Sequence, residues 1–253
     1  MMYDLQKADF WKRSSAFIFD KILLFVLAVG LAFLFSSALN IDSYSALYRE
    51  RHAAIGEEHG VDLSITKDEY DALAEDAKAL FDTAADAFNN DEQALYATAM
   101  IFNLTLITVI FSILFSYAIL EFAIPLFLKN GQTLGKKIFG VGIMRLDGVR
   151  VSAPILFIRT ILGKYTIEVM VPVMIFIGIR FNMLGLIGLI IALLVIISNI
   201  IMVIITKTNS PIHDMLASTV TVDMATQLIF DTPEAMLEYK QRVHAEMAEK
   251  SEY

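Results

Sequence analysis

Two opposite charges lie seven residues apart at the start of the first long apolar stretch of the chain. Arg13 precedes this stretch and Asp20 lies inside it. Seven residues make about two turns of an α-helix, so the two side chains share a face roughly 10 Å apart. A charge at the centre of a membrane helix costs about 2.5–3.5 kcal/mol on insertion scales, so it is usually paired or functional. We therefore expect Asp20 to belong to a buried ionic cluster or to an ion- or proton-binding site.

A second carboxylate, Glu121, lies near the end of the second apolar stretch, eight residues before Lys129. That spacing places it about 12 Å inside this end of its helix. Pro125 has no N–H to donate to the carbonyl of Glu121, so the turn loses a backbone hydrogen bond and is a candidate kink. A free carbonyl beside a carboxylate is a candidate cation site. The alternative is a permanently satisfied ionic cluster that holds the first helix against the second.

The rest of the sequence must hold these residues inside a membrane. Hydrophobic residues make up 57% of the 253 positions and the mean hydropathy is +0.60, which is typical of a membrane protein with polar loops. We predict an all-helical polytopic protein with four spans, at about 16–39, 97–128, 155–179 and 183–205. A single span over 165–205 is the alternative. The chain has no cysteine and its four histidines lack metal-ligand spacing, so we expect no metal and no cofactor.

Charge is distributed unevenly between the loops. Residues 40–98 contain 14 acidic and 4 basic side chains, whereas residues 129–164 contain 7 basic side chains and one acid. Because basic loops stay in the cytoplasm, the second region is expected inside and the first outside. We predict a multi-pass protein of the inner (plasma) membrane with both termini in the cytoplasm.

The polar regions carry local structure signals of their own. In the acidic insertion, 40–96, we predict a helical hairpin: one helix over 43–58 ended by Gly60, and a second opened by a capping box at Thr66 and Glu69 and continuing to Phe88. Asp147-Gly148 between short apolar runs predicts a small cytoplasmic β-hairpin, with 218–222 as a possible third strand. The tail, 224–253, is expected to be a cytoplasmic amphipathic segment whose helix begins at Pro233.

Several motifs follow one another in a specific order. They are Arg13 and Asp20 in the first span, Phe-Glu121 in the second, GQTLGKK from Gly131 to Lys137, VGIMRLDG ending at Gly148, Arg159, and His213-Asp214 followed by Ala217 and 218–220. Together they closely resemble the RDD family, which is named for one arginine and two aspartates.

On this chain the three naming residues of the RDD family map to Arg13, Asp20 and Asp214. The resemblance covers 1–39 and 97–223. Ser210-Pro211 departs from it where many members have a basic residue, Ser218 replaces a glycine, and the acidic insertion is unusually long. The resemblance implies a membrane protein, proposed in places as a cation/proton exchanger and in others as a partner of membrane-protein machinery.

The segment around Gly131 is not a phosphate-binding loop, because only three residues separate its glycines and Lys137 stands where serine or threonine is needed. We expect Lys136 and Lys137 to contact lipid headgroups instead. We expect Glu168 to lie at the interface, and its position beside Pro172 leaves a role in an ion pathway open. The candidate ionic cluster near the cytoplasmic surface comprises Arg13, Asp20, Glu121, Arg159, His213 and Asp214.

Two functions remain open for such a protein. The first is a transporter or cation/proton exchanger that binds a monovalent cation or proton on Asp20 and Glu121, with Arg13 or Arg159 as the competing charge. Four spans are few for a carrier, so this function favours a homo-oligomer in the lipid bilayer. The second is a non-enzymatic scaffold or regulator that docks a membrane-protein partner through 43–90. No pattern indicates catalysis or nucleic-acid binding, so we predict that the protein is not an enzyme.

Overall fold

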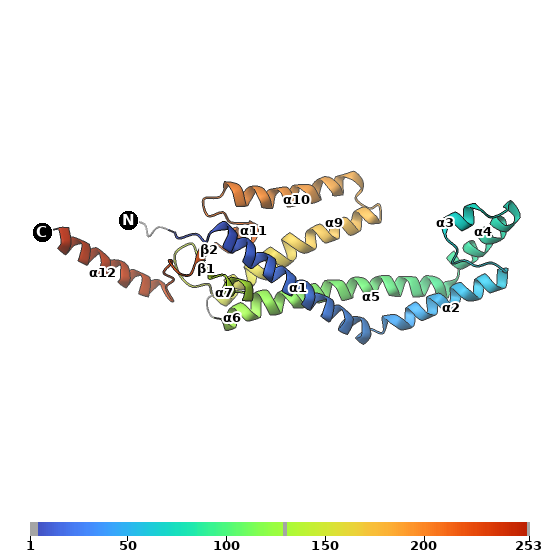
Figure 1. The fold of residues 1–253 in the computed structure, drawn as a ribbon, viewed down its shortest axis with the longest axis horizontal. Helices are drawn as coiled ribbons and strands as arrows, with labels where there is room; N and C mark the ends of the chain where they lie inside the picture. Colours follow the sequence, from blue (N-terminus) through green and yellow to red (C-terminus); the bar gives the residue numbers. More distant parts are fainter. Residues whose placement is uncertain (1–4, 129–130, 252–253) are drawn as a thin grey trace. The chain divides into compact units, whose positions relative to one another are not determined.

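In the part of the chain that the structure describes, four helices are long and apolar enough to cross a membrane. The computed structural model describes residues 5–128 and 131–251, with side chains as far as Ala248 (Figure 1). The prediction of four spans is confirmed. The spans are α1 (Phe10–Ala38); α5 (Glu92–Tyr117) with its continuation through η1 (Ala118–Ala123) and α6 (Ile124–Phe127); α8 (Ala153–Phe157), η2 (Ile158–Met170) and α9 (Val171–Arg180); and α10 (Gly185–Ile205).

The chain forms two compact units. The first contains the residues up to Leu27 together with those from Leu114 onward, and the second contains Ala28–Ile113. The candidate cluster lies entirely in the first unit, because all of its residues fall within these bounds.

The first span starts earlier than the sequence predicts. The carboxylate of Asp9 accepts a hydrogen bond of 2.9 Å from the backbone N–H of Trp11, so Asp9 caps the helix and α1 begins at Phe10. The polar first turn is therefore helical. Arg13 lies within α1, on the same continuous helix as Asp20.

The second and third spans both contain π-helical turns. In η1 the N–H of Ile124 bonds to the carbonyl of Ile119, five residues earlier, just before Pro125. Since Pro125 cannot donate to Glu121, the helix widens at this point, where the sequence predicts a kink. The 13-residue segment η2 has the same wide form. Wide turns shift the side chains around the helix axis relative to a regular α-helix.

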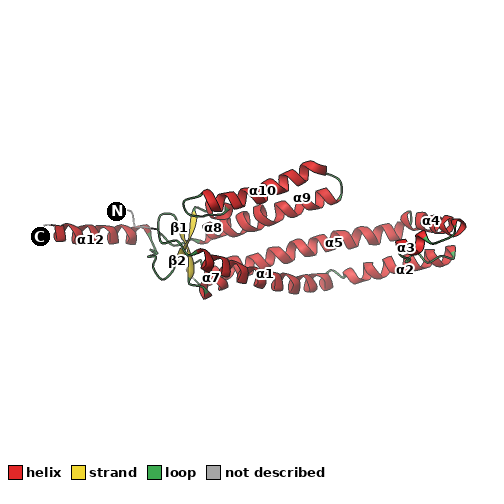
Figure 2. Cartoon of the chain, turned by 45° about the horizontal axis from the view of Figure 1, so that its top comes forward, coloured by secondary structure: helices red, strands yellow, loops and turns green. Residues whose placement is uncertain are grey.

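The first unit contains a small antiparallel sheet. Strand β1 (Val141–Arg145) pairs with β2 (Thr219–Asp223) from Val141↔Asp223 to Arg145↔Thr219 (Figure 2). The predicted β element is present, but the main partner of β1 is β2, which corresponds to the third strand predicted at 218–222. Residues 149–151 add only isolated bridges after the Asp147-Gly148 turn, in which Gly148 adopts φ +87°.

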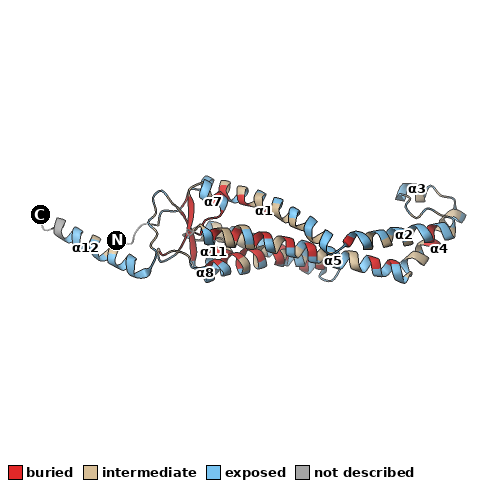
Figure 3. Ribbon diagram, turned by 90° about the horizontal axis from the view of Figure 1, so that it is seen from below, coloured by how far each residue is buried: buried red, intermediate tan, exposed pale blue. Residues whose placement is uncertain are grey.

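The sheet contains several of the most deeply buried side chains of the first unit. Val141, Ile143, Val220 and Val222 are almost fully buried, and Leu5 and Ile229 pack near the strands (Figure 3). The short helices α7 (Leu134–Ile138) and α11 (Ile212–Leu216) contact β1 and β2. The sheet thereby holds both short helices beside the spans. After it, the tail helix α12 (Pro233–Ser251) begins at Pro233, as predicted.

The second unit contains the acidic insertion, which is helical as predicted. Helix α2 (Ile41–His59) ends at Gly60 with φ +65°, and it packs against α4 (Glu75–Asn89). An ion pair of 2.7 Å joins Arg51 to Asp91. The hairpin thus packs at least partly on itself.

The second helix of this hairpin is interrupted, so the prediction of one helix continuing to Phe88 is wrong. The capping box at Thr66 is present and opens α3 (Lys67–Asp71), but a new helix, α4, starts at Glu75. The Tyr70 hydroxyl donates to Asp82 at 2.9 Å and its ring packs on Phe81. Because these contacts fold α3 back onto α4, one straight helix is excluded.

Candidate functional site

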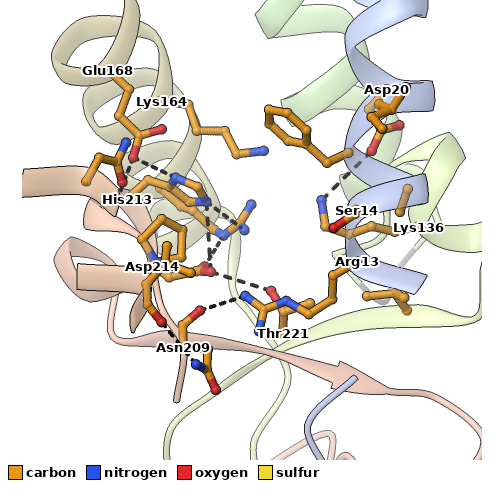
Figure 4. A pocket seen from close by; sticks show the side chains of 18 of the residues that line it. Arg13, Ser14, Asp20, Lys136, Lys164, Glu168, Asn209, His213, Asp214 and Thr221 are labelled. Atoms are coloured by element: carbon orange, nitrogen blue, oxygen red, sulfur yellow. Dashed lines mark hydrogen bonds and ion pairs between the residues drawn. The ribbon is translucent and has the colours of Figure 1, made fainter. Parts of the chain in front are cut away.

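A cavity of about 810 Å³ lies in the first unit, lined by residues of α1, η1, α7, η2, α10 and α11 (Figure 4). The side chains that the sequence analysis groups into one ionic cluster all line it. They do not form a single network, because each acid has its own set of partners. The six residues are Arg13, Asp20, Glu121, Arg159, His213 and Asp214.

The carboxylate of Asp20 is held by the start of α7. It accepts hydrogen bonds from the Thr133 hydroxyl and, at 2.8 Å, from the N–H of Gly135. A Cβ at position 135 would lie 2.5 Å from the carbonyl oxygen of Ala16, so only glycine allows this close approach. The Lys136 ammonium is 4.0 Å away. Asp20 is therefore fixed by neutral donors, with one loosely placed cation.

Arg13 and Asp20 share a face of α1 but do not form an ion pair. The guanidinium of Arg13 donates to the backbone carbonyl of Asn209, in the loop after α10, at 2.7 Å. The donors of α7 already occupy Asp20, and Lys136 is the cation nearest to it. Sequence reasoning misses Lys136 as a partner because it is 116 residues away from Asp20 along the chain.

Arg159 and Asp214 form a buried ion pair. The Arg159 Nε donates to an Asp214 carboxylate oxygen at 2.7 Å, and both side chains are only 2% exposed. The hydroxyl of Thr219 also donates to Asp214, at 2.7 Å. Burial alone would raise the pKa of the Asp214 carboxyl, but the Arg159 guanidinium and these hydrogen bonds hold it well below its usual range.

His213 is fixed as a neutral ring. Its Nε2 lies 3.2 Å from a guanidinium nitrogen of Arg159, and its Nδ1 lies 2.8 Å from the Glu168 carboxylate. Because arginine can only donate, Nε2 must accept, which leaves Nδ1 to donate to Glu168. Burial and the nearby Arg159 charge lower the pKa of His213 to about 4. A Cβ at Gly163 would lie 2.6 Å from the His213 Cβ, so this glycine admits the ring.

Glu121 pairs with Lys164, a residue that the sequence analysis does not include in the cluster. The Lys164 ammonium donates to one carboxylate oxygen, and Lys21 lies 3.9 Å from the other. The backbone carbonyl of Glu121 accepts from the Thr160 hydroxyl at 3.0 Å. The proposed cation site on a free carbonyl is therefore wrong, since η2 supplies the missing donor.

The two lysines expected at the lipid headgroups lie in different environments. Lys137 is exposed, so its headgroup contact stays a prediction. Lys136 instead lines the cavity and is only 9% exposed. Burial, together with the charges of Lys164 and Arg159, lowers the pKa of Lys136 to about 7.

Comparison with known families supports the motif resemblance. The profile of the RDD family matches residues 7–218, which include Arg13, Asp20 and Asp214. The chain belongs to the RDD family. No curated protein and no solved structure matches it.

Besides Lys136, further cavity residues of this RDD protein lie outside the cluster predicted from the sequence. Lys164 and Asn209 were not included, and Glu168, for which a pathway role was left open, points toward His213 in the cavity (Figure 4). Arg159, Lys164 and Glu168 are spaced by five and then four residues. The sequence signal covers only Lys164 and Glu168, because residues four apart share a face of a regular α-helix. Arg159 joins them through the wider π-helical turns of η2.

The lining of this RDD protein balances acids against bases. Its acids are Asp20, Glu121, Glu168 and Asp214, and its bases are Arg13, Lys136, Arg159 and Lys164, with neutral His213 between them. Over the described residues, 5–128 and 131–251, no group of three or more His, Cys, Asp or Glu side chains is arranged to hold a metal ion. The arrangement suits proton transfer and the exchange of one cation for another beside a carboxylate.

Proposed function

We propose that this RDD protein exchanges a monovalent cation for a proton through the cavity. The supporting observation is the position of Asp20, a carboxylate only 7% exposed inside a membrane-spanning helix. Its nearest ammonium, on Lys136, lies 4.0 Å away, beyond ordinary hydrogen-bond length. When this loosely held ammonium loses its proton, its positive charge disappears, and a small cation can take its place beside the carboxylate.

Lys136 supplies the proton in this exchange. Burial brings the pKa of Lys136 down to about 7, so it titrates near neutral pH. The charged groups facing it are Asp20 on α1, Glu121 on η1, and Arg159 and Lys164 on η2. When Lys136 loses its proton, a monovalent cation beside Asp20 restores the charge balance. One proton is then released for each cation bound.

Glu121 is the second acceptor in this proposal. Its carboxylate is 2% exposed and already faces two ammonium groups, Lys164 and Lys21. The competing charges are therefore lysines, in place of the arginines that the sequence suggested. Four spans form a small carrier, and the exposed apolar faces of α1 and α10 offer surfaces for lipid or for a second copy of the chain.

Flux measurements in proteoliposomes test this function. The purified protein is reconstituted into vesicles that contain a pH-sensitive dye. When Na⁺, K⁺ or Li⁺ is added outside, protons should leave the vesicles and the dye should report a rise in internal pH. The exchange rate should be half-maximal near pH 7 and higher above it. Lys136→Arg, which keeps its proton, and Asp20→Asn should each abolish the exchange. The neighbouring exposed Lys137, changed to Gln, serves as the control. Unchanged exchange in a folded Asp20→Asn protein would contradict the proposal.

The acidic insertion supports the second candidate function, a membrane scaffold. Its helices α2 and α4 pack on each other and leave many of their acids exposed, including Glu75 and Asp76. If folded wild-type protein moves none of the three cations, the scaffold becomes the better account. Site-specific cross-linking from exposed positions in 43–90 would then trap the partner in native membranes.

A further inference from the structure

The cavity has a polar end and an apolar side. The apolar side is built by one face of α1 and one face of α10, whose side chains are largely exposed: Phe17 58%, Ile18 58% and Ile200 56%. Because both helices are membrane-spanning, exposed apolar side chains on them face acyl chains. The cavity therefore opens toward lipid along these two walls. Phe10, Val195, Ile196 and Val203 complete the walls.

Arg13 stands apart from the other basic side chains of the cavity. Lys136, Arg159 and Lys164 each lie beside a carboxylate, whereas the guanidinium of Arg13 bonds to the neutral carbonyl of Asn209. Among the described residues no carboxylate forms an ion pair with it. A guanidinium carries five N–H donors, and over residues 5–128 and 131–251 those of Arg13 make one hydrogen bond, so the others are available to a ligand in the cavity.

Glu168 does not compensate the charge of Arg13. Its carboxylate accepts hydrogen bonds from the backbone N–H of His213 at 3.2 Å and from the ring Nδ1 at 2.8 Å. It also lies on the side of the cavity opposite Arg13 (Figure 4). Asp214 acts on Arg13 only through space, because its carboxylate is bonded directly to Arg159 and Thr219. An anionic ligand at Arg13 would therefore supply the direct ionic partner that this guanidinium lacks among the described residues.

The start of α1 indicates the depth of Arg13 in the membrane. Trp11 is 74% exposed and Phe10 is 68% exposed, and their rings meet edge to face. Exposed tryptophan is typical of the membrane–water interface. Arg13 is two residues further along the helix, about 3 Å deeper. Its guanidinium is then level with the phosphates of the lipid headgroups.

We propose that the cavity binds one membrane lipid with an anionic phosphate headgroup. The phosphate takes the free N–H donors of Arg13, which suit a bidentate contact, and the acyl chains lie along the walls formed by α1 and α10. A free phosphate ion would satisfy the same guanidinium but leave the apolar walls uncovered, so the lipid is the better fit. This site goes beyond cation exchange and stands even if no exchange is found.

Native mass spectrometry of the full-length protein in detergent tests the site. The protein is titrated with phosphatidylglycerol and with phosphatidylcholine of the same chains. Wild type should retain one phosphatidylglycerol in preference, and Arg13→Gln should weaken that retention at least about tenfold, because hydrogen bonds to charged groups are strong. Arg13→Lys should restore part of it. Lys12→Gln, an exposed neighbour that pairs with Asp223, is the matched control.

A second variant tests the apolar wall without touching the charge. Ile200→Trp should fill the cavity beside α10 and displace the lipid, and it carries the test if the Arg13 variants do not fold. Inorganic phosphate, added in place of lipid, should not raise the thermal stability of the protein. The proposal would be overturned if folded Arg13→Gln or Ile200→Trp retained phosphatidylglycerol as well as the wild type does. It would also be overturned if inorganic phosphate stabilised the protein as much as phosphatidylglycerol does.

Discussion

The hydroxyl of Thr160 donates a hydrogen bond of 3.0 Å to the backbone carbonyl of Glu121. This is the carbonyl that Pro125 leaves without its intrahelical donor. Four residues after Thr160, the ammonium of Lys164 binds the Glu121 side chain. One face of η2 therefore holds both the backbone and the carboxylate of Glu121. The proline breaks the helix bond, and the neighbouring span replaces it.

Thr160→Val should destabilise the protein by about 1–3 kcal/mol, because it leaves a buried carbonyl unsatisfied while keeping the shape of the side chain. Equilibrium unfolding from detergent micelles, followed by circular dichroism, measures the loss. Thr108→Val is the matched control, since the buried Thr108 hydroxyl has no hydrogen-bond partner among the described residues. That change should be neutral or slightly stabilising. Equal effects of the two substitutions would show that the bond to Glu121 contributes nothing.

The spans and the capping box could be predicted because their signals are local. Hydropathy marks the four helices, and Thr66 and Glu69 satisfy each other within three residues. The site was only partly predictable, because its pairings join distant segments. Asp20 meets Gly135, and Glu121 meets Lys164 across a π-helical face that a 3.6-residue period does not describe. Residue types and depth indicated the cluster, but only the packing of the helices selects the partners.

Gly135→Ala should disrupt the contact between α7 and the Asp20 carboxylate. The added Cβ would meet the carbonyl oxygen of Ala16 at 2.5 Å and the Asp20 carboxyl carbon at 2.9 Å, so α7 must move away from α1. Overpacking of this kind typically costs about 1–3 kcal/mol, and weakening the N–H bond to Asp20 adds to it. The unfolding midpoint in detergent should fall accordingly. Gly30→Ala on the same α1 helix is the control, since a Cβ there meets nothing within 4 Å. A stable Gly135→Ala protein would show that α7 shifts freely.

The stability of the protein should decrease as pH falls from 6.5 toward 4. The native state lowers the pKa of His213 from 6.5 to about 4. Between pH 4 and 6.5 the unfolded chain therefore binds a proton on this histidine and the native state does not. The free energy of unfolding consequently rises with pH across this window and falls as the pH is lowered. The groups facing the ring are Arg159, Lys164, Glu168 and Asp214.

The size of this pH effect follows from the two pKa values. Their separation corresponds to a loss of up to about 3 kcal/mol at pH 4. Unfolding measured at several pH values should show the slope in wild type and a shallower slope in His213→Gln. His244→Gln, at an exposed position of α12, should keep the full slope. An unchanged slope in folded His213→Gln would assign the pH effect to other groups.

Removing one partner of the Arg159–Asp214 pair should be among the most damaging changes in the first unit. Asp214→Ala strands a guanidinium that is 2% exposed, and breaking a buried pair in this way costs about 3–5 kcal/mol. The double variant Arg159→Met with Asp214→Leu should recover much of the loss, because it removes both charges and leaves no unpaired ion in the buried site. Glu75→Gln, which breaks the exposed pair with Lys78, should change stability by less than about 0.5 kcal/mol. A double variant no more stable than Asp214→Ala would mean that Thr219 and the other donors to Asp214, rather than the charge of Arg159, dominate the site.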